Sequence, residues 1–267
     1  MEIGLFPALV LGAVQGVTEF LPVSSDGHLA IAAMLFGETE MSLAMVVLLH
    51  VGTLLATLIV LRDDVRPLVV TLFTPSKWRG TEEGAALRTI LITSIPTAIV
   101  GLALHDAVEP LARSAVVVGV CLWGSALAVA STRWTAPKAT KTSLDLSVTH
   151  CVIIGIAQGL AVLPGLSRSG TSIATMMLLG LSGPTSFRLS FLLSLPAIAG
   201  AAILELRHPE VWSSLGAPAI AATVVAFLVG LAALSALRNI VAQGRFWAFA
   251  IYLVPLGAVL VVMGLYR

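Results

Sequence analysis

Long apolar runs separated by short polar stretches dominate the sequence. Six of these runs are long enough to form a membrane-crossing helix, which needs about 20 mostly apolar residues. They cover residues 44–61, 88–104, 115–131, 188–204, 216–237 and 246–266. The pattern therefore predicts an all-α polytopic membrane protein with six transmembrane helices.

Two further apolar regions, 3–36 and 148–181, are each interrupted by a polar cluster. The first is cut by "EFLPVSSDGH" (19–28) and the second by "LPGLSRSG" (163–170). The arms on either side are too short to cross a bilayer, so each region is predicted to be a re-entrant helix hairpin. Because lipid offers no partners to non-helical backbone, we expect the six spans to surround both hairpins.

The two interrupted regions resemble each other. Residues 14–27 and 157–170 share a Gln-Gly, a Leu-Pro, a serine three residues past the proline and a closing glycine. Each half of the chain then contains one hairpin followed by three spans, and an odd number of crossings inverts the second copy. We expect a single integral membrane domain, 1–267, made of inverted-topology repeats at about 1–140 and 141–267.

Composition and charge agree with a membrane protein. The chain is 58% hydrophobic and 11% charged, with a mean hydropathy of +1.01. A net charge of +1 argues against a nucleic-acid partner. The N-terminus lacks the basic region and cleavage site of a removable signal peptide. Cys121 and Cys151 lie in or beside apolar segments, where packing explains them better than a disulfide or a metal site.

The distribution of basic residues orients the chain. If residues 62–87 are cytoplasmic, most of the 15 Lys and Arg residues fall on the cytoplasmic side, as the positive-inside rule requires. The first hairpin then opens outward and the second toward the cytoplasm. We expect their tips to meet inside the membrane.

Five ionisable residues are predicted at membrane depth: Glu19, Asp26, His28, His50 and Arg168. Charge there costs several kcal/mol, so such residues usually pair, face a cavity and mark function. All but His50 lie on the hairpin tips. The structural alternatives are an ion pair between Glu19 and Arg168 that only joins the hairpins, a buried His28 with a satisfied ring, and a His50 that packs within its helix.

The tips suit a phosphate group. Half-helix N-termini attract anions, and Gly27 and Gly170 allow close approach of the backbone. Arg168 supplies a planar, charged fork that matches phosphate oxygens. Hydroxyl donors are available from Ser24, Ser25, Ser167, Ser169 and Thr171. A carboxylate, a hydroxyl and an imidazole complete a set able to act as base or metal ligand, nucleophile and proton donor.

Some of these residues have a purely structural interpretation. Pro22 and Pro164 break helices. Ser24 and Asp26 are also typical N-caps for a helix from His28 onward.

Three segments carry a resemblance to a known family. "QGVTEFLPVSSDGHL", "GLAVLPGLSRSGTSI" and "FRLSFLLSLPAIAGA" resemble the undecaprenyl-diphosphatase, or bacitracin-resistance, family along essentially the whole chain. The resemblance implies an enzyme of the bacterial plasma membrane with its site accessible from the outer side. Such an enzyme takes a polyprenyl diphosphate, undecaprenyl diphosphate, from among the membrane lipids and removes its terminal phosphate. This recycles the lipid carrier of cell-wall synthesis and confers resistance to bacitracin. The family also implies a divalent cation, Mg²⁺ or Ca²⁺.

The resemblance assigns roles to the motif residues. Glu19 corresponds to the essential acid and is the expected metal ligand, Ser25 and His28 to the nucleophile or acid–base residues, and Arg168 to the phosphate-binding arginine. The residues expected to bind substrate are Gln15, Ser24, Asp26, Gly27, Ser167, Ser169, Gly170 and Thr171.

Two positions depart from the family pattern. Gln15 stands where some members carry a second acid, and Asp26 stands where most carry Ser or Thr before the Gly-His. Asp26 either supplies the missing carboxylate or weakens anion binding by repulsion.

The main functional alternative is a flippase that moves a lipid phosphate without hydrolysis, because inverted repeats with broken helices also build transporters. A vanadate-sensitive lipid phosphatase is disfavoured, because that family needs a histidine six residues after its arginine and position 174 is an alanine. The sequence leaves the prenyl chain length and the oligomeric state open, a homodimer being one option.

Overall fold

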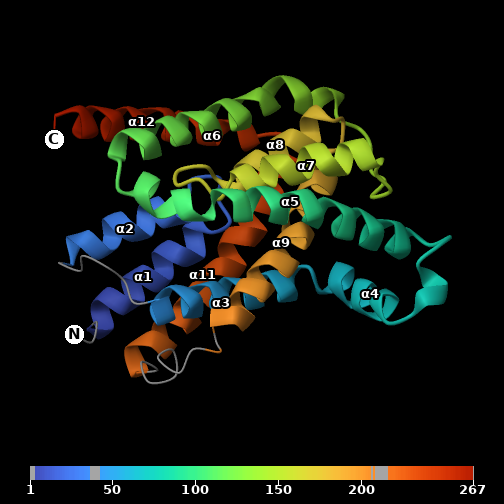
Figure 1. Ribbon diagram of the computed structural model, residues 1–267, viewed down its shortest axis with the longest axis horizontal. Helices are drawn as coiled ribbons and strands as arrows, with labels where there is room; N and C mark the ends of the chain where they lie inside the picture. The colour runs from blue at the N-terminus through green and yellow to red at the C-terminus, as the bar shows by residue number, and fades with distance from the viewer. Residues whose placement is uncertain (1–3, 37–42, 206, 208–215, 267) are drawn as a thin grey trace. The chain divides into compact units, whose positions relative to one another are not determined.

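The computed structural model is helical throughout the part of the chain that it describes, residues 4–36, 43–205, 207 and 216–266 (Figure 1). The α-helices are α1 Leu5–Thr18, α2 Ser25–Leu35, α3 Leu43–Val60, α4 Arg62–Leu72, α5 Glu82–Ala112, α6 Ala115–Thr135, α7 Val148–Leu160, α8 Arg168–Leu178, α9 Gly183–Glu205, α11 Ala217–Ala242 and α12 Ala250–Leu265. Short 3-10 helices are η1 Pro75–Lys77, η2 Ala136–Lys138 and η3 Phe246–Phe249.

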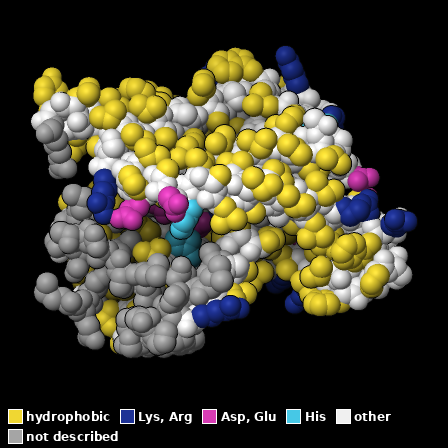
Figure 2. Space-filling model, in the orientation of Figure 1, with side chains coloured by type: hydrophobic (Ala, Val, Ile, Leu, Met, Phe, Trp, Pro, Cys, Tyr) yellow, Lys and Arg dark blue, Asp and Glu magenta, His cyan; other side chains and the backbone are white. Residues whose placement is uncertain are grey.

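The fold class predicted from hydropathy is confirmed. Among the described residues, α5, α6, α11 and the η3–α12 helix are long and apolar enough to cross a membrane, and α3 with α4 adds a fifth span if the bent pair counts as one. The predicted run 188–204 lies within α9. Figure 2 shows hydrophobic side chains over most of the described surface of one face, as expected for a protein bathed in lipid.

Both predicted interruptions are present. α1 ends at Thr18 and α2 begins at Ser25, while α7 ends at Leu160 and α8 begins at Arg168. α1 packs against α2, and α7 packs against α8. Each interrupted region is thus a helix, a turn and a helix, as the sequence predicts.

The segment 62–87, which lies between two predicted spans, contains α4 and the start of α5. α4 is not part of a continuous apolar run, because its first turn carries Asp63 and Asp64. Its exposed side chains include Val70, which is 53% exposed, and its C-cap residue Phe73 is 79% exposed. α5 begins at Glu82, earlier than the predicted span, because Thr81 caps it by accepting a hydrogen bond from the Gly84 N–H at 3.0 Å.

The chain divides into two compact units, each with segments from both predicted repeats. The first unit holds residues up to Leu21, Ser25–Val60 and Ser194–Leu237. Buried side chains of α1, α2, α3 and α11 form its core. A Cβ added at Gly12 of α1 would lie 2.4 Å from the carbonyl oxygen of Ala222 in α11, so only glycine permits this helix contact.

The second unit holds Pro22–Ser24, Leu61–Leu193 and Arg238–Arg267. Within it α12 runs along α6, and α7 along α5 (Figure 1). The guanidinium carbon of Arg133 lies 4.6 Å from the ring centroid of Trp247, which ties α6 to η3.

Candidate active site

The acid of the first motif lies where α1 ends. Glu19 is the C-cap of α1, and its backbone N–H donates to the Gln15 carbonyl at 2.9 Å. Its side chain is 8% exposed. Gln15 lies one turn earlier on the same helix face, and its Nε2 donates to Glu19 Oε2 at 3.2 Å. Gln15 therefore holds the carboxylate at the turn.

Ser25 opens the next helix and faces the same carboxylate. Its Oγ donates to Glu19 Oε2 at 3.2 Å. A hydroxyl paired with a carboxylate in this way is the arrangement in which a base activates a nucleophile. His28 lies three residues further along α2, so helical spacing places it on the same face as Ser25. The structure thus brings Gln15, Glu19 and Ser25 together, with His28 one turn away.

The turn between them depends on Ser24. This residue has a positive φ of 69°, unusual for a residue other than glycine, and its side chain is 6% exposed. Such backbone strain persists where the surrounding structure holds it in place. α2 begins at Ser25, so Asp26 lies in its first turn with an exposed side chain. The interpretation of Asp26 as an N-cap for a helix from His28 is therefore wrong.

His50 is a neighbour of Glu19 that the sequence did not identify. Its Nδ1 lies 2.9 Å from the Val46 carbonyl oxygen, as expected for a histidine packed within its own helix. Its Nε2, however, lies 3.6 Å from Glu19 Oε2. In the sequence, only the predicted position of His50 as an ionisable group at membrane depth indicated such a contact.

The residues of the second motif surround the start of α8. Ser167 is its N-cap, with Oγ accepting from the Gly170 N–H at 3.1 Å. Its own N–H donates to Ser125 Oγ at 2.8 Å, and that hydroxyl donates to the Gly165 carbonyl at 3.2 Å. Ser169 Oγ lies 3.2 Å from Ser167 Oγ. Ser125 of α6 therefore satisfies two backbone groups of the interrupted segment.

Arg168 is the first residue of α8. Its guanidinium carbon lies 5.5 Å from the ring centroid of Phe191, a fully buried residue of α9. The sequence contained Phe191 within the third motif but gave it no role. The Thr171 hydroxyl, three residues along α8 from Arg168, is buried without a hydrogen-bond partner among the described residues. A cation and a donor hydroxyl thus lie close together at a helix N-terminus, which suits an anion.

One segment of the first motif packs at this helix start. Pro22–Ser24 belongs to the second unit. A Cβ built on Gly170 would lie 3.0 Å from the Pro22 Cβ. Glycine at position 170 therefore allows Pro22 to pack against the first turn of α8.

The first motif offers oxygen ligands to a cation. Glu19 and Asp26 carry carboxylates, and Gln15 Oε1 is buried without a hydrogen-bond partner in the described chain. Such oxygens suit Mg²⁺ or Ca²⁺. No group of three His, Cys, Asp or Glu in that part of the chain is placed to hold a metal. The residues therefore fit a cation that takes its remaining ligands from water and substrate phosphate, as Mg²⁺ commonly does.

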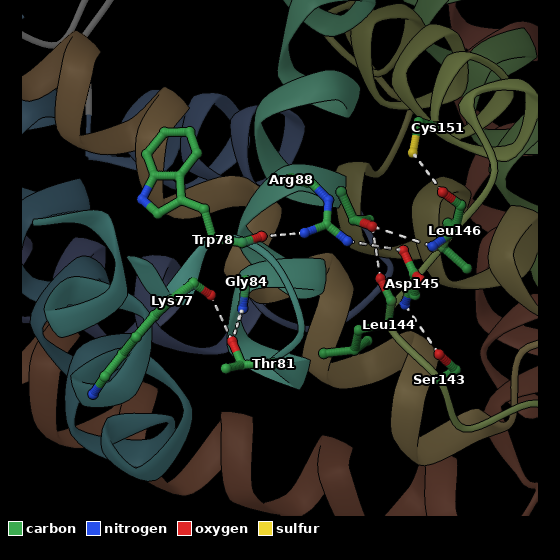
Figure 3. Close-up of polar contacts among 11 residues, drawn as sticks. Lys77, Trp78, Thr81, Gly84, Arg88, Ser143, Leu144, Asp145, Leu146 and Cys151 are labelled. Atoms are coloured by element: carbon green, nitrogen blue, oxygen red, sulfur yellow. Dashed lines mark hydrogen bonds and ion pairs between the residues drawn. The ribbon is translucent and has the colours of Figure 1, made fainter. Parts of the chain in front are cut away.

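A cavity of about 720 Å³ lies elsewhere, within the second unit. Its lining includes five carboxylates and two arginines, and none of the predicted site residues. Arg88 contacts the Trp78 carbonyl oxygen and lies 3.5 Å from Asp145 (Figure 3). Arg188 Nε donates to Asp64 at 3.0 Å. Both arginines are thus paired within the cavity wall, and their pairing joins the segments around it.

Comparison with known proteins gives matches along nearly the whole chain. The family model described as "Bacitracin resistance protein BacA" matches residues 8–259. A protein of Desulforapulum autotrophicum named undecaprenyl-diphosphatase is 38% identical, with 97% of this chain and 98% of the relative covered. Proteins of the same name from Desulfosudis oleivorans and Korarchaeum cryptofilum are 41% and 36% identical, and the matches cover 96% and 94% of this chain and 97% and 95% of the relatives.

Proposed function

The chain belongs to the bacitracin resistance protein BacA family, and from this premise we propose that it hydrolyses undecaprenyl diphosphate to undecaprenyl phosphate and inorganic phosphate. The observation that carries the proposal is the hydrogen bond from Ser25 Oγ to Glu19 Oε2 at 3.2 Å. In a bacterial plasma membrane the enzyme would take its substrate from the outer side. Its product is the lipid carrier of cell-wall synthesis, and its activity confers resistance to bacitracin.

Ser25 attacks the terminal phosphorus in this proposal. A bond forms between Ser25 Oγ and phosphorus, the hydroxyl proton passes to Glu19, and the bridging phosphorus–oxygen bond breaks to release undecaprenyl phosphate. Water then cleaves the phosphoserine, which restores Ser25 and releases inorganic phosphate. His28, one turn along α2, is the candidate for the proton transfer that assists the leaving group or the water.

Arg168 and the first turn of α8 bind the terminal phosphate. The burial of the Thr171 hydroxyl and the Phe191 ring beside the guanidinium support this role. Within the second unit, Pro22 of the first motif packs beside Gly170 in this same turn of α8. A divalent cation held by Glu19, Asp26 and Gln15 would supply positive charge that offsets the charge of the diphosphate.

Phosphate release from purified protein in detergent tests the proposal. We expect Ser25→Ala and Glu19→Gln to lose about 100- to 10,000-fold in kcat, the range for removal of a positioned acid or base. The matched controls are Ser131→Ala and Glu83→Gln, at residues outside the motifs. Near-normal turnover in both motif variants would refute the mechanism. In detergent there is no membrane to cross, so phosphate release reports hydrolysis alone. A wild-type protein that releases no phosphate would therefore favour the flippase.

The nucleophile has a separate test. Rapid quenching during turnover should trap phosphate on the peptide that contains Ser25; an acid quench preserves phosphoserine, and a parallel alkaline quench preserves phosphohistidine. Label on a histidine, or label retained after Ser25→Ala, would contradict attack by Ser25.

A further inference from the structure

We infer that Ser190 of α9 is a positioning residue for Arg168, the arginine that binds the terminal phosphate in the proposed mechanism. Arg168 is the first residue of α8, and two adjacent residues of α9, Ser190 and Phe191, hold it from the side of that helix. The inference rests on the proposed function for its kinetic consequence. The contacts themselves lie within the second unit.

Two buried hydroxyls join α9 to the first turn of α8. Ser172 Oγ lies 2.6 Å from Ser190 Oγ and 2.7 Å from the Arg168 carbonyl oxygen, with the Ser169 carbonyl oxygen a more distant acceptor at 3.5 Å. A carbonyl oxygen only accepts, so Ser172 donates its one proton to Arg168. The proton between the two serines is therefore that of Ser190. Ser172 and Ser190 are both 0% exposed, so bulk solvent does not compete for these bonds.

The next residue of α9 contacts the other end of the arginine. The guanidinium carbon of Arg168 lies 5.5 Å from the ring centroid of Phe191. Ser190 thus holds the backbone of Arg168 through Ser172, and Phe191 holds its guanidinium. Because Ser190 and Phe191 are consecutive residues of one helix, both ends of the arginine are fixed relative to the same element. A group that binds phosphate gains from support of this kind, since its side chain must be held in one geometry.

Another serine of α9 offers a matched control. Ser186, one turn before Ser190, is also 0% exposed. Its Oγ donates to the Leu181 carbonyl oxygen at 3.3 Å, beyond the end of α8. Ser186→Ala therefore removes a buried hydroxyl from the same helix without touching the support of Arg168.

Ser190→Ala tests the positioning role. We expect it to raise KM for the diphosphate by about 2- to 12-fold, the equivalent of one hydrogen bond, with kcat nearly unchanged because Arg168 binds the phosphate throughout the reaction. Ser186→Ala should leave KM unaltered. An unchanged KM in Ser190→Ala, or an equal rise in Ser186→Ala, would overturn the inference.

The double variant separates positioning from stability. Replacing both partners of a buried hydrogen bond by apolar groups costs less stability than replacing one of them. Ser172→Ala combined with Ser190→Ala should therefore unfold at a Tm no lower than that of Ser190→Ala alone, while its KM stays raised. A KM that returns to the wild-type value together with Tm would show that the bond only stabilises the protein.

A second measurement does not depend on catalysis. In detergent, the Nε–H resonance of Arg168 in protein labelled with ¹⁵N-arginine reports the position of the guanidinium over the Phe191 ring, because an aromatic ring shifts nearby proton resonances. The resonance is identified by its loss in Arg168→Lys. It should move on Ser190→Ala and stay in place on Ser186→Ala, and a resonance that does not respond to Ser190→Ala would refute the inference. If the wild type releases no phosphate while this resonance responds, the proposed function fails and the positioning role stands.

Discussion

The interrupted segment before α8 should depend for its stability on one hydroxyl, that of Ser125. Ser125 is fully buried, accepts from the Ser167 N–H at 2.8 Å and donates to the Gly165 carbonyl at 3.2 Å. Ser125→Ala leaves both backbone groups, which belong to the buried residues Gly165 and Ser167, without this partner. An unsatisfied buried polar group costs about 1–3 kcal/mol, so the two together should cost about 2–6 kcal/mol. In a chain of this size that corresponds to a fall in Tm of roughly 4–24 °C.

Thermal unfolding of the purified protein in detergent measures this effect. The matched control is Ser131→Ala on the same helix, because Ser131 Oγ bonds only locally, to the Ala128 carbonyl at 2.6 Å. We expect the control to shift Tm by less than about 2 °C, as most substitutions away from special features do. Equal shifts in the two variants would refute the reasoning that the hydroxyl supports the interrupted segment.

Two further predictions concern packing and the phosphate-binding arginine. Gly12→Ala should lower Tm, because its Cβ would lie 2.4 Å from a backbone oxygen, which costs about 1–3 kcal/mol in the free energy of unfolding. Gly101→Ala, at a position of α5 where an added Cβ meets no atom, should raise Tm and add up to about 1 kcal/mol to the free energy of unfolding. Changes of the same sign in thermal unfolding would contradict this. Phe191→Leu should raise KM for the diphosphate by about 2- to 30-fold, because it removes a cation–π contact of Arg168 worth about 0.5–2 kcal/mol. The same change at buried Phe246 should leave KM unaltered, and an equal rise there would show a general packing effect.

The sequence predicted the helices and their interruptions where length and polarity decide the outcome. The polar clusters 19–28 and 163–170 stop α1 and α7 because Pro and Gly end helices and because charge interrupts an apolar run. The motif residues Glu19 and Ser25 were also placed together, since they lie six residues apart across one turn. These predictions needed only local information.

α4 shows where that approach fails. α4 is an amphipathic helix of 11 residues with two acids in its first turn, so it is too short and too polar to be predicted as a span. Pro67 also lies inside the helix, where proline is rare. Packing of α4 against α5 decides its structure, and the sequence alone does not reveal that contact.

The residues that the sequence missed around the two motifs share a physical reason. A broken helix inside a membrane exposes polar groups that lipid cannot satisfy, so protein must provide the partners. Ser125 of α6 does so for the backbone of the second interruption, and His50 of α3 faces the carboxylate of the first. Both are polar positions in otherwise apolar spans, and both act on residues more than 30 positions away in the sequence. In such a protein, a polar side chain within an apolar span is therefore expected to contact polar groups of a nearby helix break, even where it also hydrogen-bonds within its own helix.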